Sequence, residues 1–227
     1  DGSHMAALHL SLAPGWKTYW RAPGDAGIPP LFDWKGAQAI EHVAVRWPAP
    51  KVFWQSGMRS VGYGGEVILP LHVALRNGAA DARLRGVIDI GICRDVCIPH
   101  RLRVDAVLPA QGGKPDGRIA AALASQPMGA AEAGVGPMRC TIAATDTGMT
   151  LRAEIAMPRK AAADTVIETA DPQVWVSEPE TGWQGNTLVA DARLRHVSGG
   201  AFALDRSGVR LTILQQGGAI DVQGCAR

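Results

Sequence analysis

The chain lacks the features that mark several large classes of protein. It has no run of about 18 consecutive apolar residues, which a membrane helix needs, so it is expected to be soluble and to cross no membrane. It also lacks an excess of one charge, because 23 basic and 21 acidic residues leave a net charge of +2. Without a basic patch or a long charged block there is no electrostatic footprint for nucleic acid, and no such partner is expected.

Cysteine is scarce, with four residues, whereas glycine (27) and proline (15) are abundant among the 227 residues. Hydrophobic residues make up 47%, which is enough for real cores and argues against a disordered or fibrous chain. The turn-rich composition favours many short strands. The length favours two modest domains over one large domain. Residues 1–5 resemble the remnant of a cleaved purification tag and are set aside.

Most segments alternate apolar and polar residues with the two-residue period of a half-buried strand, bounded by Gly, Pro or Asn. This pattern predicts an all-β chain of two tandem immunoglobulin-like β-sandwiches joined by a short helical linker. The clearest expected strands are residues 7–12, 42–47, 66–75, 85–90, 102–108, 150–155 and 208–214. The expected parts are a first domain at 6–110, a linker at 111–127 with a helix at 118–125, and a second domain at 128–227.

Five of the seven tryptophans lie in the first quarter of the chain: Trp16, Trp20, Trp34, Trp47 and Trp54. One interpretation is packing in the core and at corners, because Trp buries a large area in a small sandwich. The other is an aromatic surface that binds carbohydrate. The spacing alone does not separate the two.

The four cysteines form two unlike pairs. Cys93 and Cys97 are four residues apart, whereas most of the second domain separates Cys140 from Cys225. In the chain-entropy model the short loop gives a disulfide about 2 kcal/mol and the long loop about 4.6 kcal/mol. The short bridge is therefore the poorer structural staple, and its presence requires another reason.

Geometry limits how Cys93 and Cys97 can bond. Residues i and i+4 of an extended strand lie about 13 Å apart, whereas a disulfide needs Cα atoms within about 7 Å. A bond therefore requires residues 94–96 to fold back as a tight turn or a single helical turn. A small ring of that kind is readily opened and re-formed by an attacking thiolate.

Three interpretations of Cys93 and Cys97 remain open from the residues alone. The first is a redox-active dithiol, with Arg94 and His100 supplying positive charge that lowers the pKa of a nearby thiol. The second is a Cys-x3-Cys-x2-His site for Cu(I) or Zn, which supplies only three ligands. The third is an inert structural bridge.

Several motifs resemble one known family. Residues 14–30, which read PGWKTYWRAPGDAGIPP, and residues 93–99, which read CRDVCIP, resemble the N-terminal periplasmic region of ScsB. ScsB proteins are the suppressor-of-copper-sensitivity relatives of the electron-transfer protein DsbD. The similarity covers most of residues 6–109 and continues more loosely through the second domain. In DsbD the cysteine pair is more widely spaced, whereas the ScsB branch has this shorter spacing.

The resemblance implies a tandem immunoglobulin-fold module in the periplasm, attached to a membrane-embedded thiol transporter within a larger protein. In that family, electrons pass through the transporter and a thioredoxin-like domain to the cysteine pair, which then reduces periplasmic thioredoxin-fold partners. On this basis Cys93 and Cys97 match the redox pair, and Cys97 matches the residue that attacks the partner disulfide. No cofactor and no metal is expected. The only link to copper is the copper-sensitivity phenotype of the family, and the sequence itself shows no copper site.

The resemblance also implies a cap over the redox pair, at residues 53–60. We expect Trp54 or Met58, together with Tyr63, to pack near the cysteines; the alternative is an ordinary hairpin with one exposed aromatic residue.

Cys140 and Cys225 are expected to form a structural disulfide between the first and last strands of the second domain. Two other functions remain open. One is a copper chaperone that holds Cu(I) between Cys93 and Cys97. The other is a carbohydrate-binding or adhesive sandwich with permanently oxidised cysteines.

Overall fold

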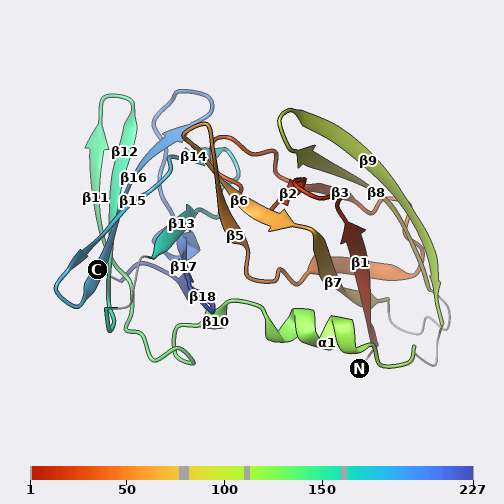
Figure 1. Ribbon diagram of the computed structural model, residues 1–227. Coiled ribbons are helices and arrows are strands. Elements are labelled where there is room, and N and C mark those ends of the chain that lie inside the picture. The colour runs from red at the N-terminus through yellow and green to blue at the C-terminus, as the bar shows by residue number, and fades with distance from the viewer. Residues whose placement is uncertain (1, 77–81, 110–112, 160–162, 227) are drawn as a thin grey trace. The chain divides into compact units, whose positions relative to one another are not determined.

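The computed structural model describes residues 2–76, 82–109, 113–159 and 163–226. The chain divides into two compact units, residues 1–126 and 127–227, and strands dominate both (Figure 1). Each unit contains two β-sheets, so the expected all-β class with immunoglobulin-like sandwiches is confirmed. In the described part of the chain no helix is long and apolar enough to cross a membrane. Residues 111 and 112 of the expected linker lie outside the described residues.

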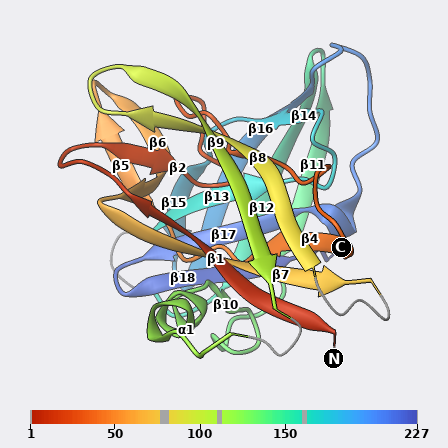
Figure 2. The same cartoon turned by 90° about the vertical axis from the view of Figure 1, so that its right-hand side faces the viewer.

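The first unit pairs a three-stranded sheet, in the order β1-β7-β4, with a six-stranded sheet, in the order β3-β8-β2-β6-β5 with β9 on β8. Figure 2 shows β8 and β9 as long neighbouring strands. Apolar side chains from both sheets, including Leu71, Val73 and Leu84, form a common buried core. The strand bounds are β1 Ser3–Ser11, β2 Lys17–Tyr19, β3 Leu31–Asp33, β4 Ile40–Val45, β5 Lys51–Gln55, β6 Met58–Gly64, β7 Glu66–Leu75, β8 Ala82–Cys93 and β9 Cys97–Leu108.

The helix α1, Gly117–Ala124, belongs to the first unit. It begins where the Asp116 side chain accepts a hydrogen bond from the Arg118 backbone N–H at 2.8 Å, which satisfies one of the free donors at a helix start. Just beyond its end, the Ser125 carbonyl accepts a bond of 2.8 Å from the Ala49 N–H. The short helical segment expected from the Ala-rich sequence is therefore tied to the first sandwich.

The second unit also contains two sheets, in the orders β10-β18-β17-β13 and β11-β12-β16-β14, with β15 on β16. Its core includes Leu151, Ile155, Leu194 and Ile213, which are at most 1% exposed. The bounds are β10 Met128–Gly129, β11 Arg139–Thr145, β12 Gly148–Ala156, β13 Asp164–Glu168, β14 Val174–Val176, β15 Glu180–Gln184, β16 Thr187–His196, η1 Arg206–Gly208, β17 Arg210–Gln215 and β18 Gly218–Gln223.

Candidate functional site

Cys93 and Cys97 lie at a tight turn between the two longest strands of the first unit. Cys93 ends β8, Cys97 begins β9, and the two are joined by a disulfide with their Cα atoms 4.1 Å apart. The intervening Arg94–Val96 segment folds back on itself, and the Arg94 N–H donates to the Val96 carbonyl at 3.2 Å. The fold-back that a bond between these two cysteines requires is therefore present.

The two sulfur-bearing residues differ in exposure. Cys93 is 1% exposed and lies between β2 and β9, whereas Cys97 is exposed at the start of β9. Thiol–disulfide exchange needs direct access of one sulfur to another. A protein partner can therefore reach Cys97 more readily than Cys93.

Tyr19 contacts both sulfurs, and the sequence interpretation missed it. Its hydroxyl donates to Cys93 Sγ at 2.8 Å and lies 3.2 Å from Cys97 Sγ. The ring fits because Gly27 and Gly91 flank it: a Cβ at either position would lie 3.0 to 3.1 Å from ring carbons. Burial raises the pKa of Tyr19, so the phenol keeps its proton and presents a hydrogen-bond donor to the sulfurs.

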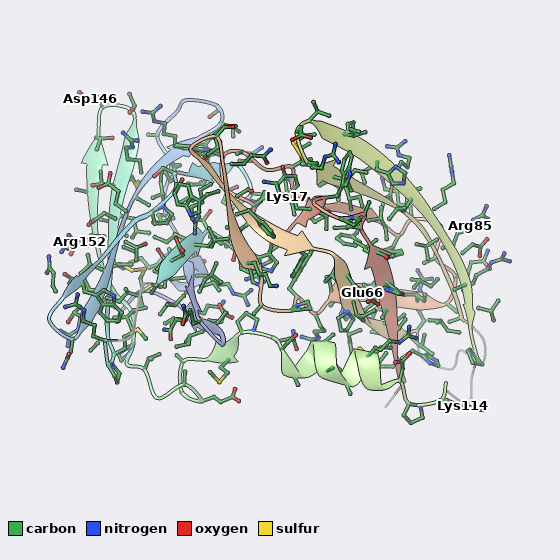
Figure 3. All side chains as sticks on the ribbon, in the orientation of Figure 1. Lys17, Glu66, Arg85, Lys114, Asp146 and Arg152 are labelled. Atoms are coloured by element: carbon green, nitrogen blue, oxygen red, sulfur yellow. A yellow bond between two sulfur atoms is a disulfide. The ribbon has the colours of Figure 1, made fainter. Side chains whose placement is uncertain are left out.

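Lys17 is the second residue that the sequence interpretation missed. It is the direct cross-strand partner of Cys93 and is 9% exposed. Its Nζ donates to Ser60 Oγ at 3.0 Å and lies 5.6 Å from the centre of the Phe53 ring. Burial lowers the pKa of Lys17. A buried cation therefore shares this sheet with the cysteine pair (Figure 3).

The segment expected to form the cap is a tight hairpin between β5 and β6. Ser56 and Gly57 connect the strands with φ values of 52° and 78°, the left-handed pair that a two-residue type I′ turn requires. The Gln55 side-chain amide donates a hydrogen bond to the Arg94 carbonyl. This bond ties the hairpin directly to the turn that carries the cysteines.

The hairpin residues predicted from the sequence point in different directions. Alternation along β6 places Met58 on the face that carries Ser60, and Ser60 bonds the cross-strand partner of Cys93. Trp54 alternates onto the other face. Met58 is 58% exposed and Trp54 63%, so neither is buried over the disulfide.

Tyr63 faces away from the cysteine pair. It is the cross-strand partner of Thr18, whereas Cys93 is the partner of Lys17, and adjacent strand residues point to opposite faces. Its buried hydroxyl donates to the Pro48 carbonyl at 2.8 Å. The structure thus gives Tyr63 a packing position in place of the expected one beside the sulfurs.

Of the two cations expected beside the cysteines, Arg94 lies in the turn and His100 lies on the opposite face of the sheet. Arg94 is in the turn, where its Nε bonds Asp95 Oδ2 at 2.9 Å and its guanidinium lies 5.7 Å from the centre of the Trp16 ring. His100 is exposed and pairs with Ile90, so alternation places it on the face opposite the sulfurs. His100 therefore does not complete a three-ligand metal site with the two cysteines.

Cys140 and Cys225 are joined by the second disulfide, with Cα atoms 5.3 Å apart and 85 residues of separation. Backbone bonds hold both ends, because Cys140 N–H donates to the Ala226 carbonyl and Cys225 N–H to the Arg206 carbonyl. The Arg206 guanidinium donates to the Cys140 carbonyl at 2.6 Å. This bridge fastens the end of the second unit to its first long strand.

Most of the clustered tryptophans pack within the first unit. Trp20 is completely buried, with the Arg21 guanidinium 3.9 Å from its ring centre. Phe32 contacts both Trp34 and Trp47, with ring centroids 6.1 Å and 6.0 Å away. Among the five, only Trp54 is mostly exposed. The cluster therefore does not form a continuous exposed aromatic surface.

Comparisons with known proteins bear on the fold of the chain. Residues 1–109 match the family model described as the N-terminal region of the thiol:disulfide interchange protein DsbD. The crystal structure of the N-terminal periplasmic domain of ScsB from Proteus mirabilis superposes with a TM-score of 0.70 at 22% identity, covering 99% of this chain and 88% of that chain. No curated protein matches. The first unit of this chain is therefore similar to the DsbD N-terminal region over residues 1–109, and the whole chain has the fold of the ScsB N-terminal periplasmic domain.

Proposed function

We propose that this chain is a periplasmic disulfide reductase module in which Cys93 and Cys97 pass two electrons to a protein disulfide. The observation that carries the proposal is the pairing of an exposed sulfur with a buried one in a short turn, with the Tyr19 hydroxyl donating to the buried sulfur. An interchange protein needs one sulfur that meets the partner and a second that resolves the mixed disulfide.

In the reduced state, the Cys97 thiolate attacks one sulfur of the partner disulfide. A Cys97–partner bond forms, the partner bond breaks, and the other partner sulfur leaves as a thiolate that takes up a proton. Cys93 then loses its proton, attacks Cys97 Sγ and expels the second partner sulfur. Each expelled partner sulfur takes up a proton, one of them balanced by the proton that Cys93 releases and the other drawn from solvent. Two electrons thus pass to the partner, and the Cys93–Cys97 disulfide is the product.

The same chemistry in reverse order reloads the module. A protein dithiol attacks the exposed Cys97 sulfur, and the buried Cys93 leaves as a thiolate. By analogy with the similar family, the reductant is a thioredoxin-like domain of the same larger protein. That domain receives its electrons from a membrane-embedded thiol transporter. The downstream partners are periplasmic thioredoxin-fold proteins. The proposed exchange proceeds through sulfur alone, so it calls for no organic cofactor and no metal.

The hairpin between β5 and β6 suits the role of a cap. Gln55 holds it to the Arg94 carbonyl, and the hairpin carries Met58 on the face that it shares with Ser60. An opening of the Gln55 bond would free the hairpin from the turn when a partner docks on Cys97.

Trapping with oxidised glutathione tests the proposal. In Cys93→Ser, the exposed Cys97 is expected to form a stable glutathione adduct. Over the same reaction time, the buried Cys93 in Cys97→Ser is expected to form little adduct. Mass spectrometry of the intact protein measures both adducts. A stable adduct on Cys93 alone, with Cys97 unreactive, would reverse the roles, and unreactive thiols in both variants would remove the function.

A further inference from the structure

The buried sulfur of Cys93 must carry negative charge in both directions of exchange. It leaves as a thiolate when a reductant attacks Cys97, and it attacks as a thiolate when it resolves a mixed disulfide. Cys93 is only 1% exposed, and burial in apolar surroundings disfavours a thiolate. The site therefore needs a compensating positive group close to Cys93.

Lys17 occupies the position next to Cys93 in the sheet. It lies on β2 directly opposite Cys93 on β8, and directly opposite Gly64 on β6. Opposite residues of neighbouring strands have their Cβ atoms about 5 Å apart and point to the same face. On that face β6 presents Gly62 and Gly64, which have no side chains, and a Cβ at Gly64 would lie 3.6 Å from the Phe53 ring.

The charge of Lys17 is not balanced by a carboxylate within the described residues. Its partners there are the hydroxyl of Ser60 and the ring of Phe53, both neutral. Arg94, the other cation close to the turn, bonds Asp95 and therefore contributes little net charge. A surface pair of that kind is also screened by solvent, whereas Lys17 as a whole residue is only 9% exposed, so its interactions are screened less.

The remaining titratable groups that face Cys93 do not replace Lys17. From β2, Tyr19 donates a hydrogen bond to the sulfur but is neutral. From the turn, Arg94 and Asp95 form their own pair, and from β9 the facing group is Cys97 itself. Lys17 is thus the cation that remains to act on Cys93.

We propose that the Lys17 ammonium stabilises the thiolate of Cys93 and so makes this buried sulfur both a competent leaving group and a competent resolving nucleophile. This inference rests on the proposed interchange function and gives Lys17 an electrostatic role in it. Lys17 gives up no proton and forms no bond to sulfur. The thiol proton of Cys93 goes to water or to the departing partner thiolate.

The test measures the titration of Cys93 in a Cys97→Ser background, by the ultraviolet absorbance of the thiolate. In Lys17→Met we expect the thiolate fraction at neutral pH to fall about tenfold, the size of a one-unit shift in titration midpoint. Lys17→Arg keeps the charge and is expected to keep most of the thiolate. Ser60→Ala removes only the hydrogen bond, and Lys51→Met removes an exposed lysine from β5, which lies two strands away from β2 in the same sheet. Both are expected to leave the titration unchanged.

A second measurement needs no change at Lys17. Because the coupling between two charges is mutual, the Lys17 ammonium is expected to hold its proton to higher pH when Cys93 is a thiolate than in the disulfide form. Nitrogen NMR of the side chain in the reduced and oxidised proteins measures this difference, so the proposal stays testable even where Lys17→Met does not fold.

An unchanged Cys93 titration in folded Lys17→Met, or an equal effect in Ser60→Ala, would overturn the inference. So would a Lys17 titration that does not respond to the redox state. Each of these outcomes leaves the glutathione adduct on Cys97 intact, so failure of this inference is distinct from failure of the proposed function.

Discussion

The two disulfides of this chain have the same covalent bond and opposite surroundings. Cys93–Cys97 closes a loop of four residues of separation, has one exposed end, and lies beside a buried lysine and a tyrosine hydroxyl. Cys140–Cys225 closes 85 residues and is held at both ends by backbone hydrogen bonds. Loop length and neighbouring groups, rather than the covalent bond, therefore separate a bridge suited to exchange from a bridge suited to stability.

The largest expected effect separates the two pairs by activity. Replacing either Cys93 or Cys97 by Ala is expected to abolish electron transfer to a protein disulfide, because each sulfur performs one of the two exchange steps. The control is the double variant Cys140→Ala/Cys225→Ala, which should transfer at the rate of the unaltered protein. The measurement is the rate of dithiol appearance in a thioredoxin-fold acceptor. An equal loss of electron transfer in the two sets of variants would show that the two bridges do not differ in function.

The next effect separates the pairs by stability. Cys140→Ala/Cys225→Ala is expected to lower the free energy of unfolding of the second unit by about 4.6 kcal/mol, which an 85-residue loop gives in the chain-entropy model. Denaturant unfolding followed by hydrogen–deuterium exchange of peptides from residues 127–227 reports on this unit. Cys93→Ala/Cys97→Ala should cost about half as much, and only in the first unit. A larger loss in the first unit would contradict this account.

A smaller effect tests the neighbours of the reactive pair. Tyr19→Phe removes the hydrogen bond to Cys93 Sγ and is expected to slow transfer about tenfold, because a bond to a charged group contributes about 1.5 kcal/mol or more. Tyr63→Phe is the matched control, since its hydroxyl bonds Pro48 on the other face. Its transfer rate should be unchanged. A slower Tyr63→Phe variant would show that Tyr63 acts on the sulfurs after all.

The smallest effect is a dependence of stability on alkaline pH in the first unit alone. Burial raises the pKa of Tyr63 far above its ordinary value near 10, and Arg21 offsets this only in part. Above about pH 10 the unfolded chain releases a proton that the folded state keeps, so stability falls as pH rises, by about 1.4 kcal/mol per pH unit. Denaturant unfolding at pH 10 and 11 measures the slope. Tyr63→Phe should reduce the slope of stability against pH. An unchanged slope would show that other groups cause the pH dependence.

The long strands of the first unit could be predicted from the sequence, whereas the short strand β2 could not. The alternating run at residues 66–75 coincides with β7, because ten residues of period two leave little ambiguity. β8 and β9 extend beyond the predicted 85–90 and 102–108 up to the cysteines. Gly91 and Pro99 interrupt the pattern there, and pairing across the turn overrides the local signal. β2 has three residues, too few for a period to show.

The same shortness explains the site residues that were missed. Lys17 and Tyr19 both lie on β2, and their positions beside Cys93 follow from pairing between segments more than 70 residues apart, which a single sequence does not reveal. The available signal was their place inside the motif at residues 14–30 that carried the family resemblance. The exposed position of Met58 and the opposite faces of Trp54 and Tyr63 depend on the register of β5 and β6, which likewise comes only from the fold.

The measurement that tests the central claim most directly is a titration of the oxidised native protein with reduced glutathione, quenched by alkylation and mapped by mass spectrometry. We expect Cys93 and Cys97 to become alkylated at low glutathione while the Cys140–Cys225 bridge stays intact and the protein stays folded. A Cys93–Cys97 bridge that survives until Cys140–Cys225 is reduced, or opens only on unfolding, would contradict it.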